Sequence, residues 1–521
     1  MASAEFGVNT TEVLFQSFNW TSSKYNGSSG SWYNHIKKLA PEIAELGVTY
    51  VWFPPPQDSL SPEGYMPRDI DKLDSKYGSE QELKACVDEL KSRGLHCLAD
   101  TVLNHRCASQ KSPNGQWTKF GGKYDWNDDA IINNDPSFHG RGHPGTGVPL
   151  AIAPNIDHQQ EFVKRDITEW LNYLRHTIGF EAYRIDYARG FSGRFVGEYM
   201  KATEPAFAVA EYWDGLAYDG DYMKPNQNEH RKRIAHYVDA TEKRAHAFDF
   251  TTKGMLMQAC KSGEYWRLKD DKGKPSGFLG MWPQKAVSFI DNHDTGSTQA
   301  HWPFPNDKVM QGYAYILTHP GMPTVFYDHV FDWKLKDQIQ QLIKLRKEME
   351  LTAACQVNIE RADNIMYVAR VSADDVTSKQ LYLKLGHGSW APSADRGWKL
   401  AASGNGYAVW TRSGIPQKEP EPSLQRIASQ VAPFLPLPVE PKPERKPSVV
   451  RLDTGDELVQ EVAALELHDD DMKFYVTNNG AGKKKIVMEL EVDEAMAIDC
   501  EFTVTLCVQR DDEVETLMKR L

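Results

Sequence analysis

The chain alternates between short apolar runs and longer segments with apolar residues at helical spacing over residues 11–330. The apolar runs, read as buried strands, are 13–18, 48–53, 96–103, 181–186, 207–211, 247–250, 286–291 and 323–328. The helical segments are 31–46, 79–93, 159–178, 192–202, 229–245, 252–261, 306–318 and, last, 336–349. Strand–helix alternation of this kind, repeated eight times, predicts an α/β fold with a parallel (β/α)8 (TIM) barrel. In such a barrel the active site lies at the carboxyl ends of the strands.

Two departures from the alternation divide the chain further. Residues 104–157, after the third strand, are rich in Gly, Asn, Asp and Pro and are too long for a loop of the barrel. We therefore expect an inserted small domain B at 104–157 and a barrel formed by 1–103 and 158–349. Residues 350–414 show the alternating runs NIMYVARV, KQLYLKL and GYAVWTR, which predict a C-terminal antiparallel β-sheet domain C.

The last part of the chain has a different composition. Residues 415–447 are rich in proline and charge, which is typical of an extended, semi-rigid linker. Residues 448–521 are acidic and contain alternating runs that predict a small β-rich tail module. This module has few aromatic residues and no tryptophan, so we expect it to dock a protein rather than to bind carbohydrate.

Composition excludes several classes of function. Hydrophobic residues make up 40% of the chain, charged residues 25%, and the formal net charge is −12. This charge argues against nucleic acid or an anionic membrane as the main partner. The seven cysteines are widely spaced and form no CxxC pair, so we expect neither a disulfide framework nor a zinc site. The N-terminus has no signal-peptide pattern, which favours a cytoplasmic protein, or a plastid protein if the chain is already processed. We also expect a monomer.

Three of the predicted strands run directly into a carboxylate. They end at Asp186, Glu211 and Asp294, with Arg184 and His293 beside two of them. An acid in this position can simply cap the following helix. Three acids at strands four, five and seven of one barrel instead indicate acid–base chemistry on a neutral polar substrate.

The motifs around these acids resemble a known family. ADTVLNH (99–105), EAYRIDYARG (181–190), AVAEYW (208–213) and FIDNHD (289–294) are similar to the four signature regions of the α-amylase family, glycoside hydrolase family 13. Stretches 64–71, 280–297 and 301–329 look like the plant-type α-amylases in particular, and the resemblance covers roughly residues 12–413.

The resemblance implies a role for each acid. Asp186 would be the nucleophile, Glu211 the general acid and then the general base, and Asp294 would bind and distort the sugar at the cleavage site. The physics agrees, because the retaining route needs two carboxyl groups about 5 Å apart that titrate differently. Arg184 shares a strand face with Asp186 and is expected to keep that carboxyl ionised.

The resemblance also implies residues that bind substrate. His105 and His293 match ligands of sugar hydroxyls, Tyr65 matches a tyrosine that stacks on the sugar ring, and Arg184 and Trp213 line the same centre. The alternative for each histidine is a local bond to backbone, and for Tyr65 it is ordinary loop packing. We expect Asp100 to pair with Arg184 and to orient it.

Calcium is where the chain departs from the plant-type pattern. Asn104 matches a calcium-binding Asn of the family, and Gly190 would supply a carbonyl. Asn155, however, stands where the plant-type enzymes carry Asp, and 143–152 lacks the aspartates expected there. The resemblance therefore implies one structural Ca²⁺ of reduced affinity, held by Asn104, Asn155 and Gly190.

The leading hypothesis is an endo-acting α-amylase that cleaves internal α-1,4-glucosidic bonds of starch and related glucans with retention. One alternative is an exo-acting or transglycosylating relative, which would use the same acids with different loops. A remote alternative is an inactive glucan-binding protein, which the intact Asp186, Glu211 and Asp294 argue against.

Overall fold

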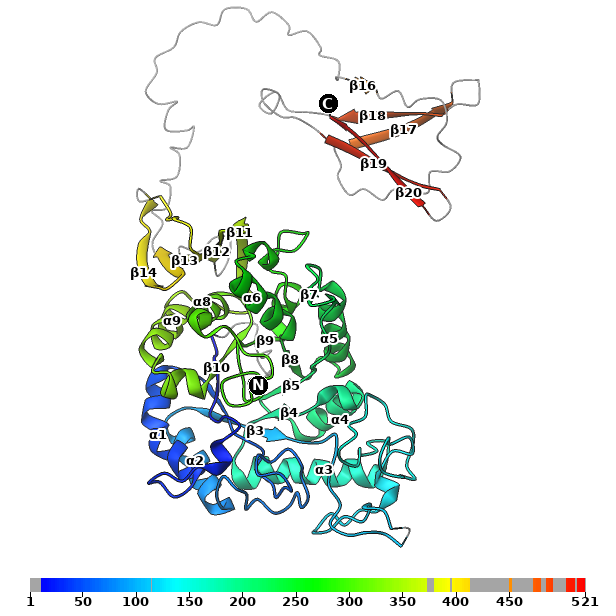
Figure 1. Ribbon diagram of the computed structural model, residues 1–521, viewed down its shortest axis with the longest axis vertical. Helices are drawn as coiled ribbons and strands as arrows, with labels where there is room; N and C mark the ends of the chain where they lie inside the picture. Colours follow the sequence, from blue (N-terminus) through cyan, green and yellow to red (C-terminus); the bar gives the residue numbers. More distant parts are fainter. Residues whose placement is uncertain are drawn as a thin grey trace, which may run out of the picture. The chain divides into compact units, whose positions relative to one another are not determined.

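The protein divides into two compact units, Met1–Glu419 and Pro420–Leu521, which are described separately. The computed structural model describes residues 11–113, 115–372, 379–393 and 396–412, and, in the second unit, the backbone of five strands (Figure 1). The predicted linker at 415–447 lies outside the described residues.

A closed barrel of eight parallel strands forms the core of the first unit, as predicted. The strands are β1 (Leu14–Gln16), β2 (Tyr50–Trp52), β3 (His96–Thr101), β4 (Ala182–Ile185), β5 (Phe207–Ala210), β8 (His246–Phe248), β9 (Ala286–Ser288) and β10 (Met322–Phe326). Pairing of β1 with both β2 and β10 closes the sheet. Apolar residues predominate in the strands because both faces of a parallel barrel are buried, and polar residues within them, such as Asp100 and Arg184, are buried as well.

Helices surround the barrel (Figure 1). They are α1 (Trp32–Leu46), α2 (Glu80–Ser92), α3 (Glu161–Tyr173), α4 (Gly193–Thr203), α5 (Asn228–Ala240), α6 (Phe250–Ser262), α8 (Val309–Thr318) and α9 (Lys336–Glu348), with a single turn, α7, at Phe278–Met281. Ser79 and Glu82 form a capping box that fixes the start of α2. The predicted helix 159–178 is instead α3 followed by a wider π-helical turn, Leu174–Ile178, which ends at Gly179 with φ 102°.

The segment predicted as an inserted domain, 104–157, is built mostly from loops. Its described residues contain one short 3-10 turn, Asp128–Ala130, and isolated bridges. Arg106 organises it: its guanidinium is buried and donates to the carbonyls of Tyr124 at 2.5 Å and Gly121 at 2.8 Å. A second small feature follows β5, the hairpin β6 (Tyr218–Asp219) and β7 (Tyr222–Met223).

The C-terminal part of the first unit is an antiparallel sheet in the order β11-β12-β13-β15-β14, as predicted. Its strands are β11 (Gln356–Ala362), β12 (Met366–Ser372), β13 (Gln380–Gly386), β14 (Lys399–Gly404) and β15 (Tyr407–Arg412). The three runs seen in the sequence are β12, β13 and β15. The edge strands β11 and β14 escaped prediction. Most residues of β14 are exposed, and in β11 the polar–apolar alternation is short and is followed by a register shift between Ile359 and Arg361.

The described strands of the second unit agree with its predicted β-rich character. β16 (Val449–Arg451), β18 (Lys484–Leu490) and β17 (Met472–Asn478) form one sheet, and β19 (Thr503–Arg510) pairs with β20 (Glu513–Arg520). None of the described helices has both the length and the apolar character needed to span a bilayer.

Candidate active site

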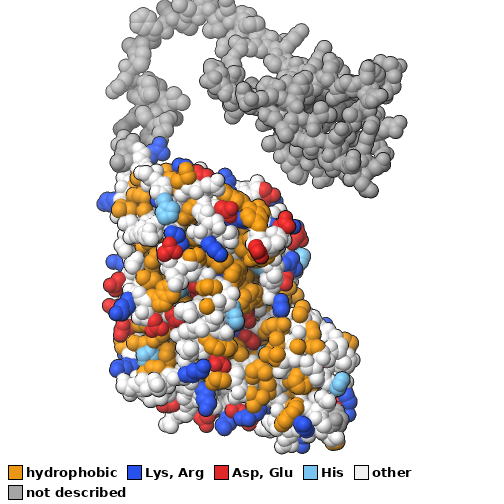
Figure 2. All heavy atoms as spheres, viewed as in Figure 1, with side chains coloured by type: hydrophobic (Ala, Val, Ile, Leu, Met, Phe, Trp, Pro, Cys, Tyr) orange, Lys and Arg blue, Asp and Glu red, His pale blue; other side chains and the backbone are white. Residues whose placement is uncertain are grey.

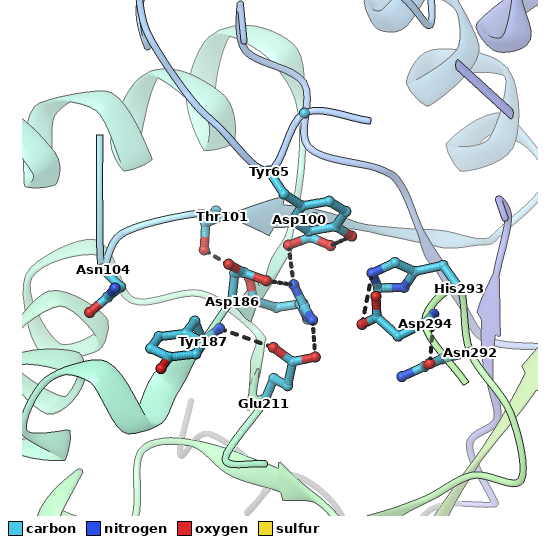
Figure 3. A network of polar contacts seen from close by, with 12 residues as sticks. Tyr65, Asp100, Thr101, Asn104, Asp186, Tyr187, Glu211, Asn292, His293 and Asp294 are labelled. Atoms are coloured by element: carbon cyan, nitrogen blue, oxygen red, sulfur yellow. Dashed lines mark hydrogen bonds and ion pairs between the residues drawn. The ribbon is translucent and has the colours of Figure 1, made fainter. Parts of the chain in front are cut away.

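The predicted acids meet at the carboxyl ends of the barrel strands. Asp186 follows β4, Glu211 follows β5, and Asp294 lies in the loop after β9. Figure 3 shows Asp186 and Glu211 close together, with Asp294 and His293 across from them. Asp186 and Glu211 are only 7% and 6% exposed, so both carboxyl groups are largely withdrawn from water.

Arg184 connects the carboxyl groups. Its guanidinium is completely buried. Nη1 contacts Asp100 at 2.8 Å and Asp186 at 2.5 Å, and Nη2 contacts Glu211 at 2.6 Å. One cation therefore holds three acids from three neighbouring strands, in the fork geometry that suits arginine rather than lysine.

Asp100 supports Arg184 from inside the barrel, as predicted. Its second oxygen accepts hydrogen bonds from Trp52 Nε1 at 3.1 Å and from the Tyr65 hydroxyl at 2.8 Å. Burial raises the pKa of Asp100 to about 6, although Arg184 acts in the opposite direction. The fully buried Asp100 cannot reach a substrate, so its role is to position the guanidinium.

The surroundings of Glu211 favour its protonated form. Burial raises the pKa of Glu211 to about 8; Arg184 opposes this, and the charges of Asp186 and Asp294 add to it. The backbone N–H of Tyr187 donates to Glu211 Oε2 at 3.0 Å and fixes the carboxyl orientation. Glu211 thus has the environment of a general acid that still carries its proton near neutral pH.

Asp294 is held in a tight turn. Asn292 Oδ1 accepts the backbone N–H of Asp294 at 3.0 Å, and Gln299 Nε2 donates to the Asp294 carboxylate at 3.2 Å. Burial, with the charges of Asp186 and Asp100 and against that of Arg184, raises the pKa of Asp294 to about 7. A carboxyl in this state can accept or donate a hydrogen bond to a sugar hydroxyl.

A wall of three nearly parallel rings stands beside Asp294. The Tyr65 and His293 ring centres are 5.0 Å apart, and Trp20 lies 5.9 Å from Tyr65 at an interplanar angle of 3°. His293 Nδ1 is hydrogen-bonded to Gln16 Nε2 at 2.8 Å. Burial and the charge of Arg184 lower the pKa of His293 well below the usual range, so the ring is neutral. Sequence reasoning missed Trp20; its position just beyond the end of β1 was the available signal.

The other predicted substrate residues have local partners. His105 is buried, and its Nε2 contacts the Tyr65 carbonyl oxygen at 2.8 Å. Burial lowers the pKa of His105, which is therefore neutral. Trp213 is half-buried and stacks on Phe250 with 5.0 Å between ring centres. For both residues, contact with substrate stays a prediction.

The residues predicted to bind calcium do come together. Asn104 Nδ2 donates to Asn155 Oδ1 at 3.1 Å, and a Cβ placed on Gly190 would lie 1.9 Å from Asn104 Oδ1. However, Asn155 Oδ1 also accepts the backbone N–H of Leu150 at 2.7 Å. The oxygen that would ligate calcium is thus already turned to two N–H donors, so this donor set does not fit Ca²⁺. Among the described residues no group of three His, Cys, Asp or Glu lies close enough to hold a metal.

A cleft lies beside the loop that carries Tyr65. It has a volume of about 450 Å³ and lies between the loop after β2 and the inserted segment, where Cys107 N–H donates to the Pro67 carbonyl at 2.7 Å. Its lining includes Met66, which follows Tyr65, and Trp117, whose side chain is 49% exposed. Hydrophobic side chains gather on this part of the surface in Figure 2, at the lower right. Sequence reasoning did not identify the cleft.

Comparisons with known proteins agree with this architecture. The family model "Alpha amylase, catalytic domain" matches residues 13–141, and "Alpha-amylase C-terminal beta-sheet domain" matches residues 348–411. Among curated relatives from Arabidopsis thaliana, "Probable alpha-amylase 2" is 45% identical, over 77% of this chain and 94% of that protein. "Alpha-amylase 3, chloroplastic" is 47% identical over 77% of this chain but only 44% of its own length, so the chain spans less than half of that relative. The solved α-amylase of Malbranchea cinnamomea has a TM-score of 0.55 at 17% identity, over 77% of this chain and 96% of that one, which shows the shared fold.

We predict that Arg184→Met lowers the free energy of unfolding at neutral pH by about 3–5 kcal/mol, because three buried carboxyl groups lose their common cation. Urea unfolding followed by circular dichroism measures the change. The folded-state pKa values of Asp100 and Glu211 are already raised, to about 6 and about 8, and loss of Arg184 removes the charge that opposes this rise. Protonation of the carboxyl groups relieves the missing cation, so the loss of stability should shrink as pH falls toward about 4.

A matched control is Lys123→Met, which breaks the pair of Lys123 with Glu169 where both side chains are about half exposed. It should lower the free energy of unfolding far less than Arg184→Met does, because exposed ion pairs contribute little. Equal losses for the two variants would contradict the central role of Arg184.

Proposed function

The chain belongs to the α-amylase family, and from this premise we propose that it hydrolyses internal α-1,4-glucosidic bonds of starch and related glucans with retention of configuration. The observation that carries the proposal is the pair of acids on one guanidinium, Asp186 on Nη1 and Glu211 on Nη2 of Arg184. Two carboxyl groups bound to one small planar cation lie within a few ångströms of each other. Such a short separation suits the retaining route, which requires about 5–5.5 Å.

The environments of Glu211 and Asp186 give the two acids different roles, general acid and nucleophile. Glu211, with its pKa raised to about 8, donates a proton to the glycosidic oxygen as the bond to C1 breaks. The Asp186 carboxylate attacks C1 and forms the glycosyl-enzyme. Glu211, now ionised, takes a proton from water, which attacks C1 and releases Asp186. The number of protons is balanced at the end of the cycle.

The remaining residues bind the sugar in this proposal. Asp294 and His293 bind hydroxyls at the cleaved unit, and the face of Tyr65 supports the ring. Arg184 acts from below by holding both reacting acids. No step passes through calcium, because the amide oxygen of Asn155 is turned to two N–H donors.

The cleft beside Tyr65 favours endo cleavage. The inserted segment lines this cleft with the half-exposed ring of Trp117. In this proposal the ring stacks on glucose units beyond the cleaved bond. An exo-acting or transglycosylating enzyme with the same acids is the second candidate. The inactive glucan-binding alternative has no support in the site, since every proposed catalytic group has its polar partners.

Location and partners remain proposals. The prediction of a cytoplasmic monomer stands beside a plastid alternative, since one relative is named chloroplastic. A docking role for residues 448–521 also stays a prediction.

Early products should distinguish the two enzymatic candidates. With soluble starch, we expect mixed oligosaccharides and a rapid loss of iodine staining in the first few per cent of turnover, measured by anion-exchange chromatography. One product of fixed length, or disproportionation of maltooligosaccharides without a rise in reducing ends, would favour the exo-acting or transglycosylating enzyme.

The protonation state of Glu211 should set the alkaline limit of activity. Because the general acid must carry its proton, kcat/KM should fall as pH rises through about 8, where Glu211 ionises. Glu211→Gln should lower kcat about 10²–10⁴-fold and remove this limb from the residual activity. An unchanged alkaline limb in the Gln variant would assign it to another group.

Removal of the Trp117 ring should affect long substrates selectively. Trp117→Ala should raise KM for amylose about 2–10-fold, the value of one aromatic contact, with kcat and the KM for maltotriose unchanged. Leu400→Ala, at another exposed apolar side chain on β14, is the control and should change neither. An equal effect on long and short glucans would place Trp117 outside the binding cleft.

A further inference from the structure

The side-chain nitrogen of Asn155 is surrounded by oxygen atoms at the junction between the inserted segment and the barrel. Nδ2 donates to Asp135 Oδ2 at 2.8 Å, to the Leu150 carbonyl at 2.7 Å and to the Ala153 carbonyl at 3.3 Å. One carboxylate and two carbonyls are the oxygen types that Ca²⁺ prefers in proteins. Here they converge on an N–H₂ group.

The orientation of this amide is fixed by its other side. Oδ1 accepts from Asn104 Nδ2 at 3.1 Å and from the Leu150 N–H at 2.7 Å. If the amide were turned over, Oδ1 would face three acceptors and Nδ2 would face two donors. Every side-chain hydrogen bond of this buried residue would be lost, at a cost of about 1–3 kcal/mol for each unsatisfied group.

The oxygen atoms around Asn155 Nδ2, from Asp135, Leu150 and Ala153, form what we call the oxygen cage. The Asp135 carboxylate in this cage has hydrogen-bond donors of its own and needs no cation. Asp135 Oδ2 accepts both the side-chain and the backbone N–H of Asn155, the latter at 2.9 Å. Its Oδ1 accepts the backbone N–H groups of Ser137 at 2.9 Å and Phe138 at 2.8 Å. Several N–H donors thus compensate one negative charge, as in other hydrogen-bonded carboxylates.

We infer that the amide nitrogen of Asn155 takes the place of the calcium ion, and that a hydrogen-bonded lock joins the inserted segment to the barrel. The lock consists of Asp135, Asn155 and Asn104. Calcium could enter only by turning the Asn155 amide over and by displacing the N–H donors of Asp135. The structural stability of the junction is therefore independent of Ca²⁺.

The lock also reaches the catalytic centre. Asn104 Nδ2 lies 3.3 Å from His105 Nδ1, and His105 in turn holds the Tyr65 carbonyl. His105 and Asn155 face each other in an isolated antiparallel bridge. The lock thus positions the loop that carries Tyr65 without the help of a metal.

The first test uses the full chain and a readout separate from activity. Thermal unfolding is followed by circular dichroism after dialysis against excess EDTA and again in excess Ca²⁺. We expect the same midpoint in both and no heat of Ca²⁺ binding by titration calorimetry. A midpoint that falls in EDTA and recovers with Ca²⁺ would overturn the inference.

The second test restores the carboxylate. In Asn155→Asp the new carboxylate faces Asp135 and the two carbonyls, so this variant should melt at a lower temperature in EDTA. Its midpoint should rise progressively with Ca²⁺ concentration, because the ion binds only the folded state. The contrary result is an Asn155→Asp variant that neither binds Ca²⁺ in calorimetry nor changes its melting temperature with Ca²⁺. That result would show that the oxygen cage is not a cation position, and it would overturn the inference that the Asn155 amide replaces calcium.

Two controls isolate the cage. Asn133→Asp adds the same charge at an exposed position of the same segment and should show no Ca²⁺ response. The double variant Asn155→Asp with Asp135→Asn removes one of the two facing carboxylates and should lose most of the response gained by the single variant. Neither experiment depends on starch hydrolysis, so failure here is distinct from failure of the proposed function.

Discussion

The contact on which the site depends is that of one buried guanidinium with three carboxyl groups. Arg184, on β4, lies inside the barrel and contacts three carboxyl groups. These belong to Asp100 on β3, Asp186 just after β4 and Glu211 just after β5. Three acids in a space without water would repel each other and become protonated together. The cation allows them to stay close and still differ, which a two-carboxylate reaction requires.

The barrel makes this arrangement possible. Parallel strands place successive residues side by side, and the register pairs Asp100 directly with Arg184 across β3 and β4. Closure through β1 and β10 then brings Gln16 to His293, and the pairing of β1 with β2 brings the loops that carry Trp20 and Tyr65 together. The rigid sheet supplies the geometry, and the burial it imposes supplies the shifted pKa values of Glu211 and Asp294.

The fold and the acids were predictable because both follow from local pattern. A strand buried on both faces is mostly apolar, so a carboxylate that ends it, such as Asp186 or Glu211, is visible in the sequence. The ring contacts of Trp20 could not be predicted from its position after β1 alone, because they join it to Tyr65 and His293 in loops far apart in the sequence. The edge strands β11 and β14 carry little or no apolar alternation, and the cleft lined by Trp117 is formed by loops without regular structure.

The junction shows why a residue type alone does not determine a metal site. That Asn155 stands in place of Asp could be read from the sequence and suggested weaker calcium binding. The direction of its amide depends on Asp135, twenty positions earlier in an aperiodic segment. That direction indicates that the amide replaces the ion. A bound ion stabilises the fold by an amount that depends on its free concentration, whereas a hydrogen-bonded lock needs no ion. From Asn155 a continuous series of contacts leads through Asn104, His105 and Tyr65 to Asp100, the residue that pairs with Arg184, so the lock is connected to Arg184 through protein contacts.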